Sequence, residues 1–311
     1  MKVNFAKMLQ NRKLAILAFL MLCLVWGTTY LGIKVAIDQH IPPFFLSAIR
    51  HLAAGTIFLV FSLVNGKKLP DSKGMMRLAI IGFLMIVGGN GLVCWAEQYL
   101  SSGLTAVICS LSPVFITIGS LFAFRNFSVS RLIVAGLLTS IFGIICIFHK
   151  SISFQVNFDS IAGVVLLVLA NLSWAIGSIF MKKNQVHTDL FLAVGLQMIF
   201  GGMMNGIISV GFEDITLLGQ INADGWWAML YLIVVGSLIG YGCYIYVLWQ
   251  YSPSRISLHT YINTIIAVFV GWMLGGEQID SYIFVGTFFV LTGVILVNHE
   301  YTKMRFNAAG D

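Results

Sequence analysis

Charge is scarce in this sequence. Of its 311 residues, 10% are Asp, Glu, Lys or Arg, whereas a typical soluble domain is about 25% charged. Apolar and aromatic residues make up 59% of the chain, and the mean hydropathy is +0.92. This composition excludes a soluble enzyme, a nucleic-acid-binding protein and a disordered protein. It predicts an integral membrane protein.

Several motifs that carry chemistry are also absent. The five cysteines all fall inside apolar runs without a C-x-x-C pair, which favours small packing residues over disulfides or a metal site. No G-x-x-x-x-G-K-[ST], H-E-x-x-H or G-x-S-x-G motif occurs, so a nucleotide-driven motor or a hydrolase has no visible machinery. We therefore expect a protein that is not an enzyme, with no catalytic residue, cofactor or metal.

What the sequence does contain is a series of long apolar runs separated by short polar loops. The ten runs are 14–36, 44–64, 77–99, 102–124, 130–148, 159–181, 188–211, 226–250, 254–274 and 281–298. About 20 helical residues cross a hydrocarbon layer of about 30 Å, and the alternating pattern of barrel strands is missing. The expected fold is all-α, with ten transmembrane helices.

Basic residues indicate the orientation of these helices. The loops on one side contain 15 of the 18 Lys and Arg residues: Lys2, Lys7, Arg12, Lys13, Lys67, Lys68, Lys73, Arg77, Arg125, Arg131, Lys182, Lys183, Arg255, Lys303 and Arg305. The opposite loops contain only Lys150. Because basic loops stay in the cytoplasm, we expect both termini to be cytoplasmic. The net charge of +6 is explained by topology, so no nucleic-acid partner is expected.

The two halves of the chain resemble each other at an offset of about 150 residues. The matches are Trp26 with Trp174, Lys34 with Lys182, Gln98-Tyr99 with Gln250-Tyr251, Gly136 with Gly286, and Gly143 with Gly293. They predict one repeat at 14–148 and a second at 159–298, with cytoplasmic tails at 1–13 and 299–311. Five helices per repeat would give the second repeat inverted topology, the architecture of secondary transporters with a solute site near the midplane.

Polar and aromatic side chains at mid-membrane depth predict a central cavity. At 1.5 Å per residue, Trp26 lies about 18 Å into its helix. The expected cavity residues are Trp26, Tyr30, Asn90, Trp95, Trp174, Tyr244, His259 and Asn263. Each type has a structural alternative, because aromatic rings also anchor helices at the interface, and Asn or His side chains also bond neighbouring helices.

Glu97 is the one carboxylate that we assign to a span instead of a loop. We expect it to form a coupling or gating cluster with Arg50 or Lys34. A structural ion pair between two helices is an equally good interpretation, and Lys34 can also extend to the outer surface. Glu277, in the loop before the last helix, is interpreted as an interface or gate contact.

These residues resemble a known family. The motifs are Trp26-Gly27-Thr28-Thr29-Tyr30, Arg50 with Gly55, Ala96-Glu97-Gln98-Tyr99, Ser102-Gly103 with Ala106 and Pro113, Ser173-Trp174 with Gly177-Ser178, and Gly275-Gly276-Glu277. Over 14–298 the chain is similar to the EamA family of the drug/metabolite transporter superfamily, and specifically to inner-membrane exporters. The resemblance implies a ten-helix bundle around a cavity. The second half departs from it, since Thr264 stands where the first half has Pro113.

The function expected from repeat, cavity and resemblance is export of a small organic solute by a secondary-active permease of the bacterial cytoplasmic membrane. The solute would be an amino acid, a metabolite or a drug-like compound, with protons as a candidate coupling ion. A facilitative channel, an importer and a non-transporting scaffold subunit are the alternatives. The expected partners are this solute and the lipid bilayer, and the expected assembly is a monomer or a homodimer.

Overall fold

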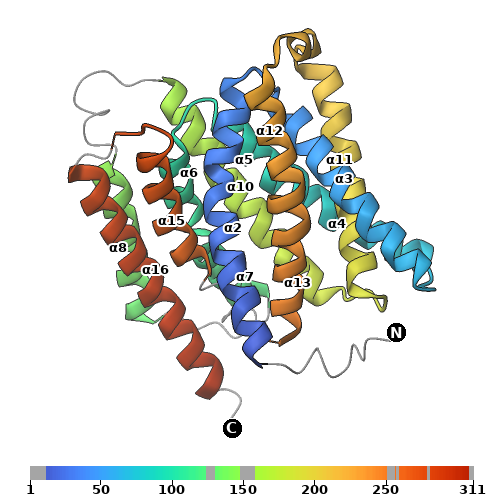
Figure 1. Ribbon diagram of the computed structural model, residues 1–311. Helices are drawn as coiled ribbons and strands as arrows, with labels where there is room; N and C mark the ends of the chain where they lie inside the picture. Colours follow the sequence, from blue (N-terminus) through green and yellow to red (C-terminus); the bar gives the residue numbers. More distant parts are fainter. Residues whose placement is uncertain are drawn as a thin grey trace.

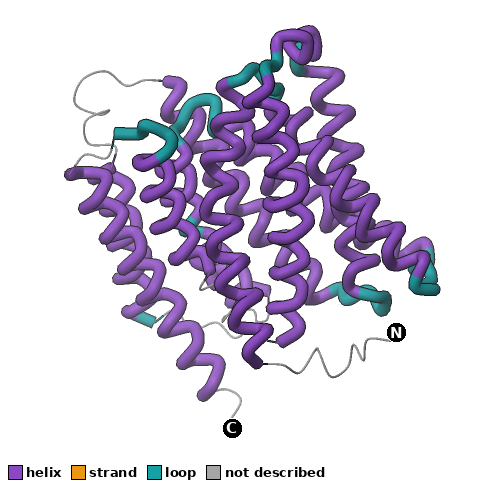
Figure 2. Tube along the Cα trace, viewed as in Figure 1, coloured by secondary structure: helices purple, strands orange, loops and turns teal. Residues whose placement is uncertain are grey.

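The computed structural model describes residues 12–123, 130–147, 158–250, 256, 259–278 and 281–307. Within these residues every regular element is helical and no strand occurs (Figure 2). Residues 124, 148, 254–255 and 257–258 of the expected spans lie outside this set, as do the loop residues Lys2, Lys7, Arg125, Lys150 and Arg255.

The helices follow one another in a single bundle (Figure 1). In chain order they are α2 (Arg12–Asp38), α3 (Pro43–Val64), α4 (Ser72–Gly82), η1 (Phe83–Gly91), α5 (Leu92–Ala96), α6 (Ser102–Cys109), α7 (Ser112–Ala123), α8 (Arg131–Ile147), α10 (Phe158–Lys183), α11 (Leu190–Phe212), η2 (Ile215–Gln220), α12 (Ala223–Tyr231), η3 (Leu232–Ile239), α13 (Gly240–Gln250), α15 (His259–Met273) and α16 (Ser281–Asn307). α2 begins and α16 ends at the same end of the bundle, the lower one in Figure 1.

Six helices in the described residues are long and apolar enough to cross a membrane. They are Lys13–Asp38, Pro43–Val64, Ser72–Ala96, Phe158–Lys183, Leu190–Phe212 and Ala223–Tyr244. Three further apolar helices are shorter: Ser102–Ile116, Arg131–Ile147 and Ser281–Val297. Large apolar side chains such as Leu20, Leu138 and Ile207 are more than half exposed, as expected for helices that face lipid.

The third and eighth expected spans each contain a π-helical segment. In the third span this segment is η1, and in the eighth it is η3. π-helical turns inside α-helices frequently occur at functional sites. Both spans also begin before their expected starts, at Ser72 and Ala223.

The fourth expected span is interrupted by a turn at Ser110 and Leu111. Pro113 has no amide hydrogen to bond a carbonyl four residues earlier, and it disfavours helical backbone in the residue before it. Thr264 stands at the matching position of the second half. There α15 runs unbroken from His259 to Met273.

Two antiparallel helix pairs pack backbone against backbone through small residues. A Cβ on Gly136 of α8 would lie 2.6 Å from the carbonyl oxygen of Gly293 in α16, and a Cβ on Gly143 would lie 2.6 Å from that of Gly286. Between these contacts, Ser140 Oγ donates to the Val290 carbonyl at 3.4 Å. Such close approach is the packing mode of small-residue motifs in membrane helices.

The second of these pairs consists of α3 and α11. A Cβ on Gly55 would lie 2.8 Å from the Gly195 carbonyl oxygen, and a Cβ on Gly202 would lie 3.2 Å from that of Ala48. In each pair, one residue of the first contact can be moved forward along the sequence and the other moved back by the same number of positions. The two residues reached in this way form the second contact. The contacts are therefore reciprocal.

Candidate functional site

A cavity of about 730 Å³ lies inside the bundle. Its walls come from α2, α3, η1, α7, α10, α13 and α15, and thus from both halves of the chain. The volume is that of a typical small-molecule site. Seven of the eight expected cavity residues line it: Trp26, Tyr30, Asn90, Trp174, Tyr244, His259 and Asn263.

Trp26 of α2 is the centre of an aromatic cluster in this cavity. Its ring stacks on Tyr244 with centroids 5.3 Å apart and an interplanar angle of 24°. Tyr241 and His259 meet the same indole edge-on, each with a centroid distance of 5.3 Å. The indole Nε1 donates to the Gly236 carbonyl at 3.2 Å, which fixes the ring against the π-helical segment η3.

Trp174 of α10 packs against the other π-helical segment. A Cβ on Gly89 of η1 would lie 2.9 Å from the Trp174 ring, so the glycine is needed for this contact. The neighbouring Ser173 Oγ donates to the Leu84 carbonyl at 2.7 Å. Each matched tryptophan therefore rests on the π-helical segment of the opposite half.

Amide side chains complete the polar part of the lining. Asn90 Nδ2 donates to the hydroxyl of Tyr241 at 3.2 Å. The Asn263 amide nitrogen donates to the Cys23 and His259 carbonyls, both at 2.9 Å. Asn171 Nδ2 donates to Ile108 O at 3.2 Å and Leu167 O at 2.8 Å, and its oxygen accepts from Ser112. It thereby satisfies carbonyls beside the break between α6 and α7.

Trp95 does not line the cavity, contrary to expectation. Its side chain is 38% exposed and packs against Phe44, with ring centroids 5.6 Å apart. Among the lining residues, the expected site set leaves out Tyr241, Asn171, Gln197 and Pro113. Tyr241 lies three residues before Tyr244 on the same helix face, a spacing that the sequence already displays.

The expected cluster of Glu97 with Arg50 or Lys34 is not assembled. Lys34 Nζ pairs with Asp38 at 2.7 Å, on its own helix. Arg50 Nε donates to Ser237 Oγ at 3.0 Å and lines the cavity. Glu97 is fully buried outside the cavity lining, and both its carboxylate oxygens lack a hydrogen-bond partner among the residues that the structure describes.

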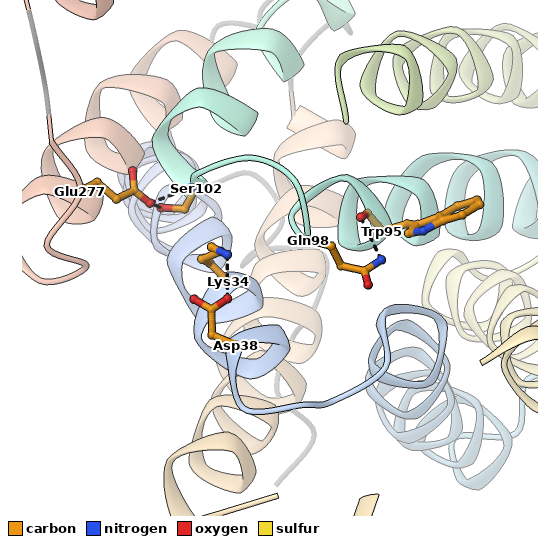
Figure 3. A network of polar contacts seen from close by, with 6 residues as sticks. All are labelled: Lys34, Asp38, Trp95, Gln98, Ser102 and Glu277. Atoms are coloured by element: carbon orange, nitrogen blue, oxygen red, sulfur yellow. Dashed lines mark hydrogen bonds and ion pairs between the residues drawn. The ribbon is translucent and has the colours of Figure 1, made fainter. Parts of the chain in front are cut away.

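Figure 3 shows three separate polar contacts: Lys34 with Asp38, Gln98 with the Trp95 carbonyl, and Ser102 with Glu277. We refer to Lys34, Asp38, Gln98, Ser102 and Glu277 as the closed end, because none of them lines the cavity. Glu277 accepts from Ser102 N at 2.7 Å, from Ser102 Oγ at 2.6 Å and from Gly103 N at 3.1 Å. A carboxylate at a helix N-terminus is favoured by the helix dipole, so Glu277 fastens the end of α15 to the start of α6.

The opposite end of the cavity, the open end, reaches the α10–α11 connection. Lys182, Asn184, Gln185, Val186 and His187 belong to the lining there. This is the end of the bundle where α2 begins and α16 finishes (Figure 1). The cavity lining therefore extends from Trp26 to this end of the bundle.

No group of three or more His, Cys, Asp or Glu side chains that could hold a metal occurs among the described residues. The five cysteines are free thiols. Cys94 is buried beneath α3 and α12, in a cluster with Leu46 and Met229. What the cavity offers is aromatic rings, amides and basic side chains.

Comparison with known proteins decides the family. The sequence model of the EamA-like transporter family matches the chain twice, over residues 13–149 and 161–299. The chain belongs to the EamA-like transporter family. Among its relatives in this family are the inner membrane transporter YedA of Escherichia coli (strain K12), 30% identical with 90% of this chain and 89% of YedA covered, and the transporter YoaV of Bacillus subtilis (strain 168), 26% identical with 93% and 98% covered.

Protein PecM of Dickeya dadantii (strain 3937) is a third EamA relative, 28% identical with 92% of both chains covered. A solved crystal structure shares the fold, with a TM-score of 0.66 and 14% identity over 94% of this chain and 99% of the other. Family membership and six span-length apolar helices identify a multi-pass membrane protein, and its relatives YedA and YoaV are named as transporters.

Proposed function

We propose that this EamA protein is a secondary-active permease that exports a small organic solute across the cytoplasmic membrane by alternating access. The main observation behind this proposal is the cavity of about 730 Å³, which is lined by both halves of the chain and open at one end. A binding site that is accessible from one side at a time is the requirement for alternating access. The Glu277 contacts argue against an open channel, because a channel needs both ends open together.

The proposed architecture is ten transmembrane helices in two inverted five-helix repeats. The reciprocal glycine contacts of α8 with α16 and of α3 with α11 support it, because a pseudo-twofold axis maps such contacts onto one another. The difference in accessibility between the two ends of the cavity supports two conformations of one scaffold, because inverted repeats can exchange their roles at the two sides of the membrane.

The proposed orientation places the open end and both termini in the cytoplasm. Lys182 belongs to the lining at this end, and Lys67 pairs with Asp189 at the start of α11, in agreement with the positive-inside rule. In this orientation the structure represents the inward-open conformation. The solute then enters from the cytoplasm, as export requires.

Glu97 is the proposed site of proton coupling. Its carboxylate is buried without a hydrogen-bond partner among the described residues, while Glu277, Lys34, Arg50 and Asp38 act on it electrostatically. An isolated carboxylate is costly in such surroundings unless it binds a proton or gains a cationic partner.

The test compares cells that overproduce the wild type, Glu97→Gln, or neither. Export predicts a solute that is enriched in the medium, by mass spectrometry, only with the wild type. In proteoliposomes loaded with that solute, Glu97→Gln should abolish proton-driven flux and retain exchange of labelled for unlabelled solute. Glu300→Gln, in the stretch of α16 beyond the expected last span, is the matched control. The same solute concentrations in the media of all three strains would contradict export. Proton-driven flux in Glu97→Gln would contradict the coupling role.

A further inference from the structure

The cavity has an uneven charge. Its described lining includes the basic residues Arg50 and Lys182, whereas no Asp or Glu belongs to the described lining. Field lines concentrate in a low-dielectric cavity, and a cavity with this lining attracts anions.

Arg50 is buried and incompletely bonded. Its side chain is 3% exposed, its Nε donates to Ser237, and its Nη1 has no partner among the described residues. The ion pairs found in the described chain do not include Arg50. Glu97 acts on Arg50 electrostatically without contacting it, and a buried charge is strongly unfavourable unless its hydrogen-bonding groups are satisfied. Arg50 therefore lacks a bonded partner at Nη1 among the described residues.

The guanidinium lies beside the aromatic cluster. Both Arg50 and Trp26 approach Gly236 of η3: Arg50 Nη2 lies 3.6 Å from a Cβ placed there, and Trp26 Nε1 bonds its carbonyl. Ser237, the next residue, holds Nε and so fixes the plane of the guanidinium. A fixed guanidinium is the preferred partner of a carboxylate because its N–H groups match both oxygens.

We propose that Arg50 is the anion anchor of this cavity and that the transported solute is a small organic carboxylate with a planar ring. Its carboxylate bonds Arg50, and its ring packs on the face formed by Trp26 and Tyr244. The amides of Asn90 and Asn263 border the same space and select polar substituents. This assignment rests on the proposed function and narrows it from any organic solute to organic anions.

The test uses three probes that share one ring and differ in charge: indole-3-acetate, indole-3-acetamide and tryptamine. Binding to the purified full chain in nanodiscs is measured by titration calorimetry. We expect indole-3-acetate to bind at least 10-fold more tightly than either other probe. One charge-assisted bond sets the expected loss in Arg50→Gln at about 10- to 100-fold for indole-3-acetate, with indole-3-acetamide binding changed less than about 2-fold.

Arg50→Lys and Arg131→Gln are the matched variants. Lysine keeps the charge without the planar fork, so Arg50→Lys should recover part of the loss. Arg131 is exposed at the start of α8 and does not line the cavity, so Arg131→Gln should bind indole-3-acetate like the wild type. Retained indole-3-acetamide binding shows that Arg50→Gln is folded. Equal affinity for the three probes, unchanged binding in Arg50→Gln, or no indole-3-acetate binding at about 1 mM would each overturn the anchor.

Flux separates this proposal from the permease proposal. Selective indole-3-acetate binding without any flux in proteoliposomes would refute the permease and leave the anchor standing. Flux of a neutral or cationic solute that Arg50→Gln leaves intact would refute the anchor and leave the permease standing.

Discussion

Gly136 of α8 and Gly293 of α16 touch through their backbones, and the contact leaves no room for a methyl group. A Cβ on Gly136 would lie 2.6 Å from the Gly293 carbonyl oxygen, and a Cβ on Gly293 would collide with the carbonyl oxygen of Gly136. Backbone atoms cannot yield as a flexible side chain can. The distance between the two helices is therefore set by the absence of side chains at these two positions.

Gly136→Ala and Gly293→Ala should each destabilise the protein. Overpacking of a close contact costs about 1–3 kcal/mol, and we expect a lower midpoint of thermal unfolding in detergent. Because both substitutions separate the same helices, the double variant should lose less than the sum of the single losses. Gly242→Ala is the control, since nothing lies within 4 Å of a Cβ there. Equal midpoints for Gly136→Ala and Gly242→Ala would refute the packing argument.

Trp26→Ala should reduce solute binding far more than Trp26→Phe. Alanine removes the stacked contact with Tyr244 and the edge contacts of Tyr241 and His259, whereas phenylalanine keeps a ring and loses only the Nε1 bond. An aromatic pair contributes about 0.5–1.5 kcal/mol beyond its buried area, so we expect at least 3-fold weaker binding in Trp26→Ala. Trp227→Ala is the control, because that ring is 68% exposed. A Trp26→Ala variant that binds like Trp227→Ala would remove Trp26 from the site.

Glu277→Ala should open the closed end. It removes three hydrogen bonds to Ser102 and Gly103, and a lost helix cap costs about 0.5–2 kcal/mol. In a background that lacks the five native cysteines, Tyr30→Cys should react with a membrane-impermeant thiol reagent from the outside faster when Glu277 is also replaced.

Glu213 similarly accepts from Phe44 N and Phe45 N at the start of α3. Glu213→Ala is a control that removes a cap from a different helix pair, and equal labelling in all backgrounds would exclude gating by Glu277.

Asn171→Leu should destabilise the break between α6 and α7. Leucine has a similar size but leaves the Ile108 carbonyl and the Ser112 hydroxyl without their partner. A buried polar group that loses its bond costs about 1–3 kcal/mol, which should lower the unfolding midpoint. Asn65→Leu is the control, since Asn65 bonds the Phe61 carbonyl at an exposed helix end. Equal stability of both variants would show that Asn171 is dispensable to the break.

The helical ranges and most of the cavity could be predicted from the sequence, since composition and depth carry that information. Trp26 is far from both ends of α2, and an aromatic ring there has no interface to anchor in. Trp95 and Glu97 lie outside the cavity lining. Both follow the π-helical η1, and a π-helical segment changes the 3.6-residue period that determines which face a later side chain takes.

The partner of Arg50 could not be read from the sequence either. Charge alone favours Glu97, yet Ser237 of η3 bonds the guanidinium. That serine is distant in sequence and becomes a neighbour only when α3 packs against η3. Lys34 was within reach of Asp38 by the ordinary four-residue spacing of a helix, and this local pair is the one that forms.

The α8–α16 seam has a consequence for how such a chain can change over evolution. When each glycine is replaced by its match in the other half, the Gly136–Gly293 contact becomes the Gly143–Gly286 contact. An isologous dimer interface has the same geometry. A half-length chain that carried one such glycine helix could make the same seam with a second, oppositely inserted copy of itself. Within one polypeptide the two sides are now free to diverge, so a larger residue on one helix can be offset by a smaller one on the other.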